Sequence, residues 1–362
     1  MMIKQLKSFT IKMVAGANVA TVILMILVGF SDRINPVTHP SLSCMGLFFP
    51  IFLFINLGFL FFWLMFKRRM ILIPVIGYAL VFVPLRIYMP INVPADMPDG
   101  VIKVLSYNVK GFNGAPRYEG TFDMIRDYIK QSDADIVCLQ EDMGGWTNGK
   151  SRLDSIYKYC DNTYVGTANN NAVGIYTRFP ILRKERINYP SEGNGSVAYY
   201  LKVNRDTVIV INNHLESTHL SPEERRKYKD ILKGEMEQDT ARAESKKLLY
   251  RLAESAKIRG PQADSVHHYI ATHSQYPIIL CGDFNDNPIS YSHRVISKEL
   301  TDCYISTGRG IGLSYNQKGF FVRIDNIMCS ERFKPYNCKV DNKIDASDHY
   351  PIYCWLKMKP KL

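Results

Sequence analysis

Polar residues that suit the chemistry of a phosphate or a metal ion follow an apolar run in the second half of the chain. The segment from Pro277 to Pro288 reads PIILCGDFNDNP. Its apolar half predicts a buried strand, and the polar residues would begin where that strand ends. Asp283 and Asn285 would point to the same side, because side chains alternate along a strand. A carboxylate beside an amide suits a metal-bound phosphate, whereas a polar turn after a core strand is an equally good interpretation of this segment alone.

Polar residues also stand at the ends of four other predicted strands. They are Asn108 after Val101–Tyr107, Glu141 after Asp135–Leu139, His214 after Val208–Ile211, and the pair Asp348-His349 before Ile352–Leu356. Taken singly, Asn108 suits a turn, Glu141 a helix cap, His214 a core hydrogen bond and Asp348 a loop cap. Because buried strands seldom need polar ends so often, the five strand ends together predict one shared site.

Strands and helices alternate through this part of the chain. Thr121–Lys130 has the spacing of an amphipathic helix and lies between two predicted strands. Val173–Tyr176 and Ala198–Val203 predict further strands, so that helices should cover a layered sheet. A charged helical region follows over 221–275 and should break at Gly260-Pro261. We expect its charges to face solvent and assign it no chemistry.

The first 90 residues are strongly apolar. Met13–Phe30 and Ile34–Phe66 contain no charged residue, and Met70–Met89 contains only Arg86. A bilayer core needs about 20 mostly apolar residues per helix. The sequence therefore predicts a membrane anchor with three transmembrane helices, near 12–31, 45–66 and 70–89.

A proline-rich segment over 91–100 separates this anchor from the rest of the chain. It reads INVPADMPDG, and its prolines resist helix formation and favour an extended linker. We therefore expect a membrane anchor over 1–90, a linker over 91–100 and a soluble domain over 101–362.

Basic residues beside the spans predict the orientation. Three lysines (Lys4, Lys7 and Lys12) precede the first span and Lys67-Arg68-Arg69 follows the second, whereas the loop between them has only Arg33, beside Asp32. Because basic loops stay in the cytoplasm, the N-terminus and the loop 67–69 should be cytoplasmic. Three spans place the domain outside the cytoplasm, and two would leave it inside. A cleaved signal peptide is the alternative for the first span, but its apolar stretch is long and no small-residue cleavage pattern follows Phe30.

The net charge of the chain limits the classes of molecule that it could bind. The formal net charge is +11, of which +5 belongs to the first hundred residues. The remaining +6 suits a phosphate-bearing substrate or an anionic membrane surface. The domain lacks the lysine and arginine clusters of a dedicated nucleic-acid binder.

The polar motifs, in their order along the chain, resemble those of the endonuclease/exonuclease/phosphatase superfamily, whose fold is that of pancreatic deoxyribonuclease. The resemblance covers essentially all of 101–362 and implies an α/β (α+β) fold, a four-layered α/β sandwich with two central, mostly antiparallel sheets. The three spans lie outside the family pattern. The matching motifs are Asn108, Gln140-Glu141, Asn212-Asn213-His214-Leu215, Gly282-Asp283-Phe284-Asn285, Arg323-Ile324-Asp325 and Ser347-Asp348-His349-Tyr350-Pro351.

This resemblance implies a role for each site residue. Glu141 would be the principal ligand of a Mg²⁺ ion, for which Mn²⁺ could substitute, with Asn108 and Asp348 completing or flanking the site. Asp325 would orient His349, which would contact the phosphate or act as general base. Asp283 would position the attacking water, and either it or His349 would be the base. His214 would stabilise or protonate the leaving group, and Asn285, His349 and Asn212 would contact the substrate phosphate.

The resemblance thus implies a membrane-anchored, metal-dependent hydrolase of a phosphoester or phosphodiester. Its partners would be a phosphate-ester substrate and the lipid bilayer, through residues 1–90, with no protein partner inferred. A nuclease and a phospholipid or sphingomyelin-type phosphodiesterase are alternative activities. A non-catalytic membrane scaffold is a further alternative, but it would predict a broken set of site residues, and every expected position is filled.

Overall fold

Two mixed β-sheets form the centre of the C-terminal domain in the computed structural model, which describes residues 2–112, 120–147, 149–166, 171–317 and 322–360. The first sheet has the order β13-β14-β1-β2-β6-β5 and the second β11-β12-β10-β9-β8-β7. The first contains β1 (Ile102–Asn108), β2 (Ile136–Gln140), β5 (Tyr159–Val165), β6 (Asn171–Thr177), β13 (Phe333–Val340) and β14 (Ile352–Met358). The second contains β7 (Ile181–Ile187), β8 (Gly195–Val203), β9 (Asp206–His214), β10 (Ile278–Asp283), β11 (Thr301–Asp302) and β12 (Asp325–Cys329).

Each sheet has one parallel pair at its centre, and its other neighbours are antiparallel. These pairs are β1 with β2 and β9 with β10. The mixed, mostly antiparallel sheets predicted for this domain are therefore confirmed. In addition, β3 (Trp146–Thr147) and β4 (Lys150–Ser151) form a short hairpin.

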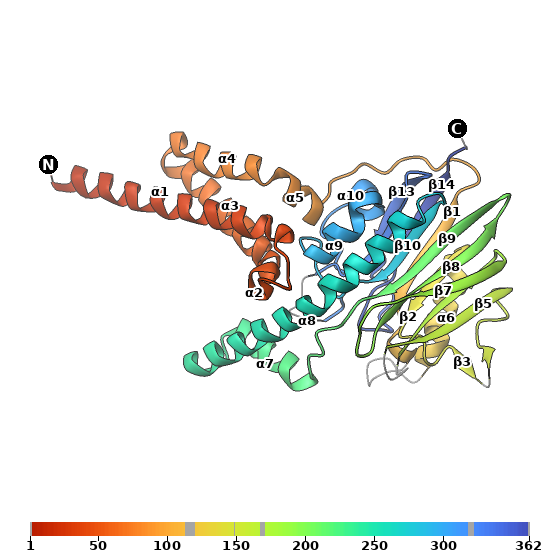
Figure 1. The fold of residues 1–362 in the computed structure, drawn as a ribbon. Coiled ribbons are helices and arrows are strands. Elements are labelled where there is room, and N and C mark those ends of the chain that lie inside the picture. Colours follow the sequence, from red (N-terminus) through yellow and green to blue (C-terminus); the bar gives the residue numbers. More distant parts are fainter. Residues whose placement is uncertain (1, 113–119, 148, 167–170, 318–321, 361–362) are drawn as a thin grey trace.

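Apolar side chains fill three layers between and outside the sheets. One core lies between the two sheets and includes Val104, Ile175 and Val210. Helix α6 (Thr121–Ser132) covers the outer face of the first sheet. Helices α8 (Gln238–Thr272) and α9 (Tyr291–Ile296) cover that of the second. Helix α10 (Cys303–Thr307) packs at β13 (Figure 1).

The charged helical region differs from its prediction in one respect. Helix α7 (Pro222–Lys233) ends at Gly234, whose φ of 71° is left-handed, and α8 then continues through Pro261 without a break. The predicted break at Gly260-Pro261 is therefore wrong. Residues on both sides of Pro261, such as Ala256 and Val266, are buried, and this packing outweighs the hydrogen bond that the proline removes.

The N-terminal helices form a bundle at one side of the domain (Figure 1). Two segments, Gln5–Arg33 and Pro40–Phe66, are long and apolar enough to cross a membrane. The third predicted span is bent by 64° between Arg68–Leu80 and Phe82–Tyr88, so that up to three spans are possible if this pair counts as one. The α-helices are α1 (Met2–Gly29), α2 (Pro40–Ser43), α3 (Phe49–Phe66), α4 (Leu72–Leu80) and α5 (Phe82–Tyr88).

A buried polar network joins α1 to α3. Asn18 Nδ2 donates to Asn56 Oδ1 at 2.9 Å, and Trp63 Nε1 donates to Asn18 Oδ1 at 2.9 Å. All three side chains are fully buried. Because unsatisfied polar groups are costly in an apolar environment, this network should fix how the two helices pair.

Replacing Asn56 with leucine should weaken this pairing by about 1–2 kcal/mol, because Asn18 loses its acceptor. Denaturant unfolding of the full-length protein in detergent micelles would measure the change. Val19→Leu, at an exposed position of α1 next to Asn18, is the control and should have little effect. Equal stability of Asn56→Leu and wild type would contradict a pairing role for the network.

Candidate active site

The two parallel strand pairs bring the predicted residues to one edge of the sandwich. Asn108 and Gln140 face each other at the ends of β1 and β2. His214 and Asp283 do so at the ends of β9 and β10, and Asp325 begins β12 opposite Asp283. Since the carboxyl ends of parallel strands lie at the same edge, two strand pairs suffice to assemble the site.

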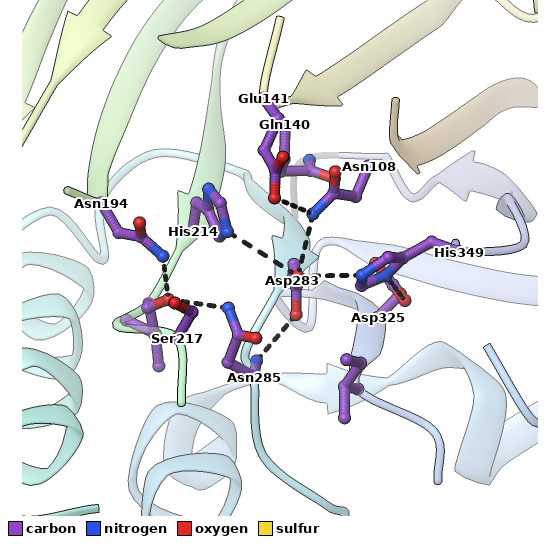
Figure 2. Close-up of polar contacts among 12 residues, drawn as sticks. Asn108, Gln140, Glu141, Asn194, His214, Ser217, Asp283, Asn285, Asp325 and His349 are labelled. Carbon is purple, nitrogen blue, oxygen red and sulfur yellow. Dashed lines mark hydrogen bonds and ion pairs between the residues drawn. The ribbon is translucent and has the colours of Figure 1, made fainter. Parts of the chain in front are cut away.

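The Asp283 carboxylate lies at the centre of the site (Figure 2). Its Oδ2 accepts a hydrogen bond from Asn108 Nδ2 at 3.1 Å. His214 Nε2 and His349 Nε2 each lie 3.7 Å from the same oxygen. The other oxygen, Oδ1, accepts from the main-chain N–H of Asn285 at 2.7 Å. One carboxylate thus connects four of the residues that the sequence singles out.

Gly282, which precedes Asp283, has a backbone that a larger residue would not tolerate. Its φ is 142°, and a Cβ would lie 1.8 Å from the carbonyl oxygen of Asn213 on β9. The close approach of β10 to β9 at this point therefore requires glycine. This close approach fixes the position of Asp283 at the end of β10.

His349 is held by a carboxylate on its other side. Its Nδ1 lies 2.9 Å from Asp325 Oδ2. Burial alone would lower the pKa of His349, but the carboxylates of Asp325 and Asp283 outweigh burial and raise it to about 10. The ring is therefore an imidazolium that donates through Nδ1 to Asp325 and presents Nε2–H toward Asp283.

The pKa shifts of Asp283 and His214 favour the uncharged forms, in contrast to the shift of His349. Burial raises the pKa of Asp283 to about 7, although His349 opposes the change. Burial likewise lowers the pKa of His214 to about 3, and the positive charge of His349 adds to this effect. Asn171 Nδ2 lies 3.4 Å from His214 Nδ1. We infer from this contact the tautomer in which His214 Nε2 carries the hydrogen.

Three of the buried side chains are close enough to hold a metal ion. Ligand atoms of Asp283, Asp325 and His349 lie within 4.8 Å of one another. Asp325 Oδ1 is buried and has no hydrogen-bond partner, as expected where a cation belongs. A second such group is formed by Glu192, which precedes β8, and by Glu216 and His219, which lie between β9 and α7. The carboxylates of Asp283 and Asp325 therefore fit a hard divalent cation, whereas His349 could be a ligand only after losing a ring proton.

The three residues predicted as metal ligands lie beside this cluster. Glu141 Oε1 accepts from Asn108 Nδ2 at 3.1 Å, so the amide connects Glu141 to Asp283. Glu141 also has a left-handed φ of 55°, an uncommon conformation for this residue type. Asp348 instead pairs with Lys110 Nζ at 3.1 Å and lies 3.8 Å from Arg225. Metal binding by Glu141, Asn108 and Asp348 remains a prediction.

Asn285 and Asn212 differ from their expected places. β10 ends at Asp283 and Asn285 has a left-handed φ of 50°, so the alternation expected from the sequence no longer applies. The Asn285 side-chain amide donates to Leu215 O at 2.9 Å, away from Asp283 (Figure 2).

Asn212 lies between the two sheets. It donates to the carbonyls of Leu139 and Gly174 and accepts from Gln140 Nε2 at 2.7 Å. Both amide hydrogens are thus used and the side chain is fully buried. The predicted contact between Asn212 and the substrate phosphate is therefore not available in this structure, and the residue connects the two sheets instead.

The structure adds residues that the sequence motifs do not single out. Arg225, from the helical region expected to have no chemistry, lies near Asp348. The Tyr315 ring packs edge-on against His349 with centroids 5.2 Å apart. Asn194 donates to Leu215 O, the acceptor that it shares with Asn285. None of these lies at the end of a predicted strand, so the sequence offered no signal for them.

A cavity of about 670 Å³ adjoins the site. It lies between the linker, at Asn92 and Pro94, and the segment that contains Tyr315. Tyr350, next to His349, also lines it. Arg309 and Lys339 are the charged residues of the described lining, so the cavity favours neutral or anionic groups.

The two mixed sheets, with a buried Asp/His cluster at their common edge, define a phosphoesterase fold. The model of the Endonuclease/Exonuclease/phosphatase family matches residues 105–349, and the chain belongs to this family. A second model, Domain of unknown function (DUF8431), matches residues 11–88. The sequence comparison with curated proteins gave no significant match.

Solved structures of low sequence identity have the same fold. An endonuclease/exonuclease/phosphatase family protein from Bacteroides thetaiotaomicron is 19% identical, with a TM-score of 0.51 over 73% of this chain and 100% of that one. The human Nocturnin catalytic domain with bound sulfate anion is 14% identical, with a TM-score of 0.53 over 74% and 97%. A humanized D. rerio TDP2 is 16% identical, with a TM-score of 0.51 over 71% and 99%.

Proposed function

We propose that this protein is a membrane-anchored, Mg²⁺-dependent hydrolase of phosphoesters or phosphodiesters. The observation that carries the proposal is the position of Asp283 Oδ2. This oxygen lies 3.7 Å from the Nε2 atoms of two histidines, of which His214 is neutral and His349 is positively charged. A buried carboxylate with a raised pKa is suited to accept a proton from water near neutral pH. The family of the chain supports the same chemistry.

Each residue then has one part in the reaction. Asp283 holds the attacking water and accepts its proton. His349, kept charged by Asp325, donates through Nε2 to a phosphoryl oxygen. His214 Nε2–H donates to the leaving group or to the phosphoryl oxygen beside it, and the low pKa of this histidine favours hydrogen bonding over proton transfer.

A bound Mg²⁺ would neutralise charge on the phosphoryl oxygens. Glu141 is the proposed principal ligand, with Asn108 and Asp348 at its side, and Mn²⁺ is a possible substitute. The cavity beside Tyr315 and Tyr350 has room for the alcohol part of the substrate.

A phospholipid phosphodiesterase is the second candidate, and one observation favours it. Ile289, six residues after Asp283, packs in a cluster with Met25, Val28 and Phe49 at the domain end of the helix bundle. Six residues span at most about 20 Å. The site therefore lies close to the level at which the bundle ends, where a lipid phosphate would be found.

A hydrolysis panel on the full-length protein in lipid nanodiscs tests these candidates. It includes p-nitrophenyl phosphate, bis-p-nitrophenyl phosphate, phospholipids of the disc, DNA and RNA, with Mg²⁺, and Asp283→Asn as the background. Turnover of at least one phosphate ester above this background supports a hydrolase, and turnover of none would support a scaffold. A nuclease would also bind nucleic acid less tightly as the salt concentration rises. An affinity for nucleic acid that does not change with salt concentration would therefore count against nuclease activity.

We further propose that the N-terminus is cytoplasmic and the domain extracytoplasmic, in a cell or inner membrane. Helix α1 leads toward the domain, α3 leads away from it, and α4 with α5 returns (Figure 1). The loop after α1 also contacts the domain, with Asp32 3.6 Å from Arg294. These contacts support three crossings, because loop and domain must then share one side.

Protease treatment of intact cells tests this orientation. If the domain is extracytoplasmic, a protease that reaches that face of the membrane should degrade it, after removal of the outer membrane where one exists. A cytoplasmic marker protein serves as the control for leakage. A domain that stays intact while an extracytoplasmic marker is degraded would contradict the three-span topology.

A further inference from the structure

Two segments of the active site extend into the end of the helix bundle. One follows β10 and contains Ile289, which is 1% exposed. The other precedes β12 and contains Arg323, also 1% exposed. The first begins at Asp283 and the second leads into Asp325, so each starts or ends at a residue of the catalytic cluster.

Arg323 connects the last membrane helix to the catalytic histidine. It donates through one terminal nitrogen to Ile87 O at 2.9 Å, near the end of α5, and through the other to Ile311 O at 2.8 Å. The guanidinium lies 4.5 Å from the centre of the Tyr304 ring. Two residues later, Asp325 holds His349 at 2.9 Å. A shift of Arg323 would therefore move the carboxylate that orients the histidine.

Ile289 fits against the loop between the first two spans. A Cβ on Gly46 would lie 2.1 Å from Ile289 O, so that the two backbones are in direct contact. On α8, Gly260 approaches Pro36 of the same loop in a similar way, with 2.6 Å between its Cβ position and the proline ring. The loop thus contacts the domain at Ile289 and at Gly260. The neighbours of these two residues are also joined, because the buried Arg259 pairs with Asp286.

The two segments are also joined to each other inside the site. Phe284 N donates to Ile324 O at 2.9 Å. Asp283 and Asp325 are paired in the register of β10 and β12. Displacement of either segment from the bundle would therefore move the carboxylates of both Asp283 and Asp325.

We propose that the helix bundle is a structural part of the active site, and that Arg323 is a positioning residue that fixes Asp325 and His349 through its bond to Ile87. The inference builds on the proposed hydrolase activity for its kinetic consequence. Its structural consequence, local order at the ends of β10 and β12, does not depend on any substrate.

The first test replaces Arg323 with lysine in the full-length protein in detergent micelles. A lysine has the charge but cannot donate to two carbonyls in the planar geometry of a guanidinium. We expect kcat on a p-nitrophenyl phosphate ester to fall about 10- to 100-fold with KM nearly unchanged, because small displacements of catalytic groups have effects of this size. Arg332→Lys is the matched control, since Arg332 also donates to a main-chain carbonyl, at Lys359, and should keep wild-type kcat.

Two further measurements keep the result interpretable. Added guanidinium should restore part of the activity of Arg323→Ala, which a general loss of folding would not allow. Hydrogen exchange at the amides of Phe284 and Asp325 should be faster in Arg323→Lys than in wild type. Unchanged kcat and unchanged exchange would overturn the positioning role. If wild type hydrolyses nothing, the proposed function fails, and the exchange result alone decides the inference.

The second test cuts the linker without removing the bundle. A protease site inserted after Met97, which is 47% exposed, allows cleavage in micelles of the otherwise intact protein. We expect the cut domain to stay bound to the bundle and to keep its activity. In Ile289→Ala the docking is weaker, so the cut domain should separate and lose kcat. A cut domain that separates with full activity would show that the bundle is only a tether.

Discussion

Replacing Asp283 with asparagine should lower kcat by about 10²- to 10⁴-fold, the usual range for loss of a general base. The substitution keeps the shape of the side chain but removes the charge on Oδ2, the atom that faces Asn108, His214 and His349. It also places a second amide group opposite the Asn108 amide. The measurement is steady-state hydrolysis of bis-p-nitrophenyl phosphate by the full-length protein with Mg²⁺.

The matched control for Asp283→Asn is Asp302→Asn. Asp302 is also a buried acid in the same sheet, and it lies 2.8 Å from His293 in a pair outside the site. This change should reduce stability and leave kcat close to that of wild type. If the two variants lose activity to the same extent, the effect of Asp283→Asn would reflect lost folding rather than lost chemistry.

Chelation of divalent ions with EDTA should abolish hydrolysis, and Glu141→Ala should lower kcat by about 10²- to 10³-fold with Mg²⁺ present. Glu141 is joined to Asp283 through the Asn108 amide, which lies 3.1 Å from each carboxylate. Loss of the glutamate therefore removes both the proposed metal ligand and one acceptor of that amide. Activity should return when Mg²⁺ or Mn²⁺ is added to the chelated wild type.

Glu185→Ala is the control for Glu141→Ala. Glu185 lies on β7, at the edge of the second sheet, and accepts hydrogen bonds from Tyr200 on β8 and Tyr269 on α8. It should retain wild-type kcat and the same response to EDTA. Hydrolysis that survives both EDTA and Glu141→Ala would exclude the proposed metal-dependent mechanism.

The strand ends show how far the sequence could predict this site. Apolar runs followed by polar residues predicted β1, β2, β9 and β10, and with them Asn108, Glu141, His214 and Asp283. This works because a buried strand must be apolar and its polar end must leave the sheet. The resemblance to the family added the mostly antiparallel pairing, which local patterns do not contain.

The errors arise where distant contacts decide the structure. Asn285 was expected to face the same way as Asp283, but its amide bonds to Leu215, 70 residues earlier. The sequence predicts Asn212 at the phosphate, but its side chain lies between the sheets and accepts a hydrogen bond from Gln140, 72 residues away. The edge strands β5 and β7 were not predicted, since their half-buried side chains alternate poorly. Periodicity along the chain does not report such contacts.

The packing of Ile289 against the helix bundle also has a consequence for the biogenesis of the protein. Apart from Ile311, the residues that pack with Ile289 in this cluster lie between Met25 and Met89 and so precede the domain in the chain. During synthesis they emerge before β10 exists, because chains are made from the N-terminus. If the helices cross a membrane as proposed, the domain completes its folding on a helix bundle that is already assembled there. β14, which begins at Ile352 shortly after His349, is the last strand to join the domain.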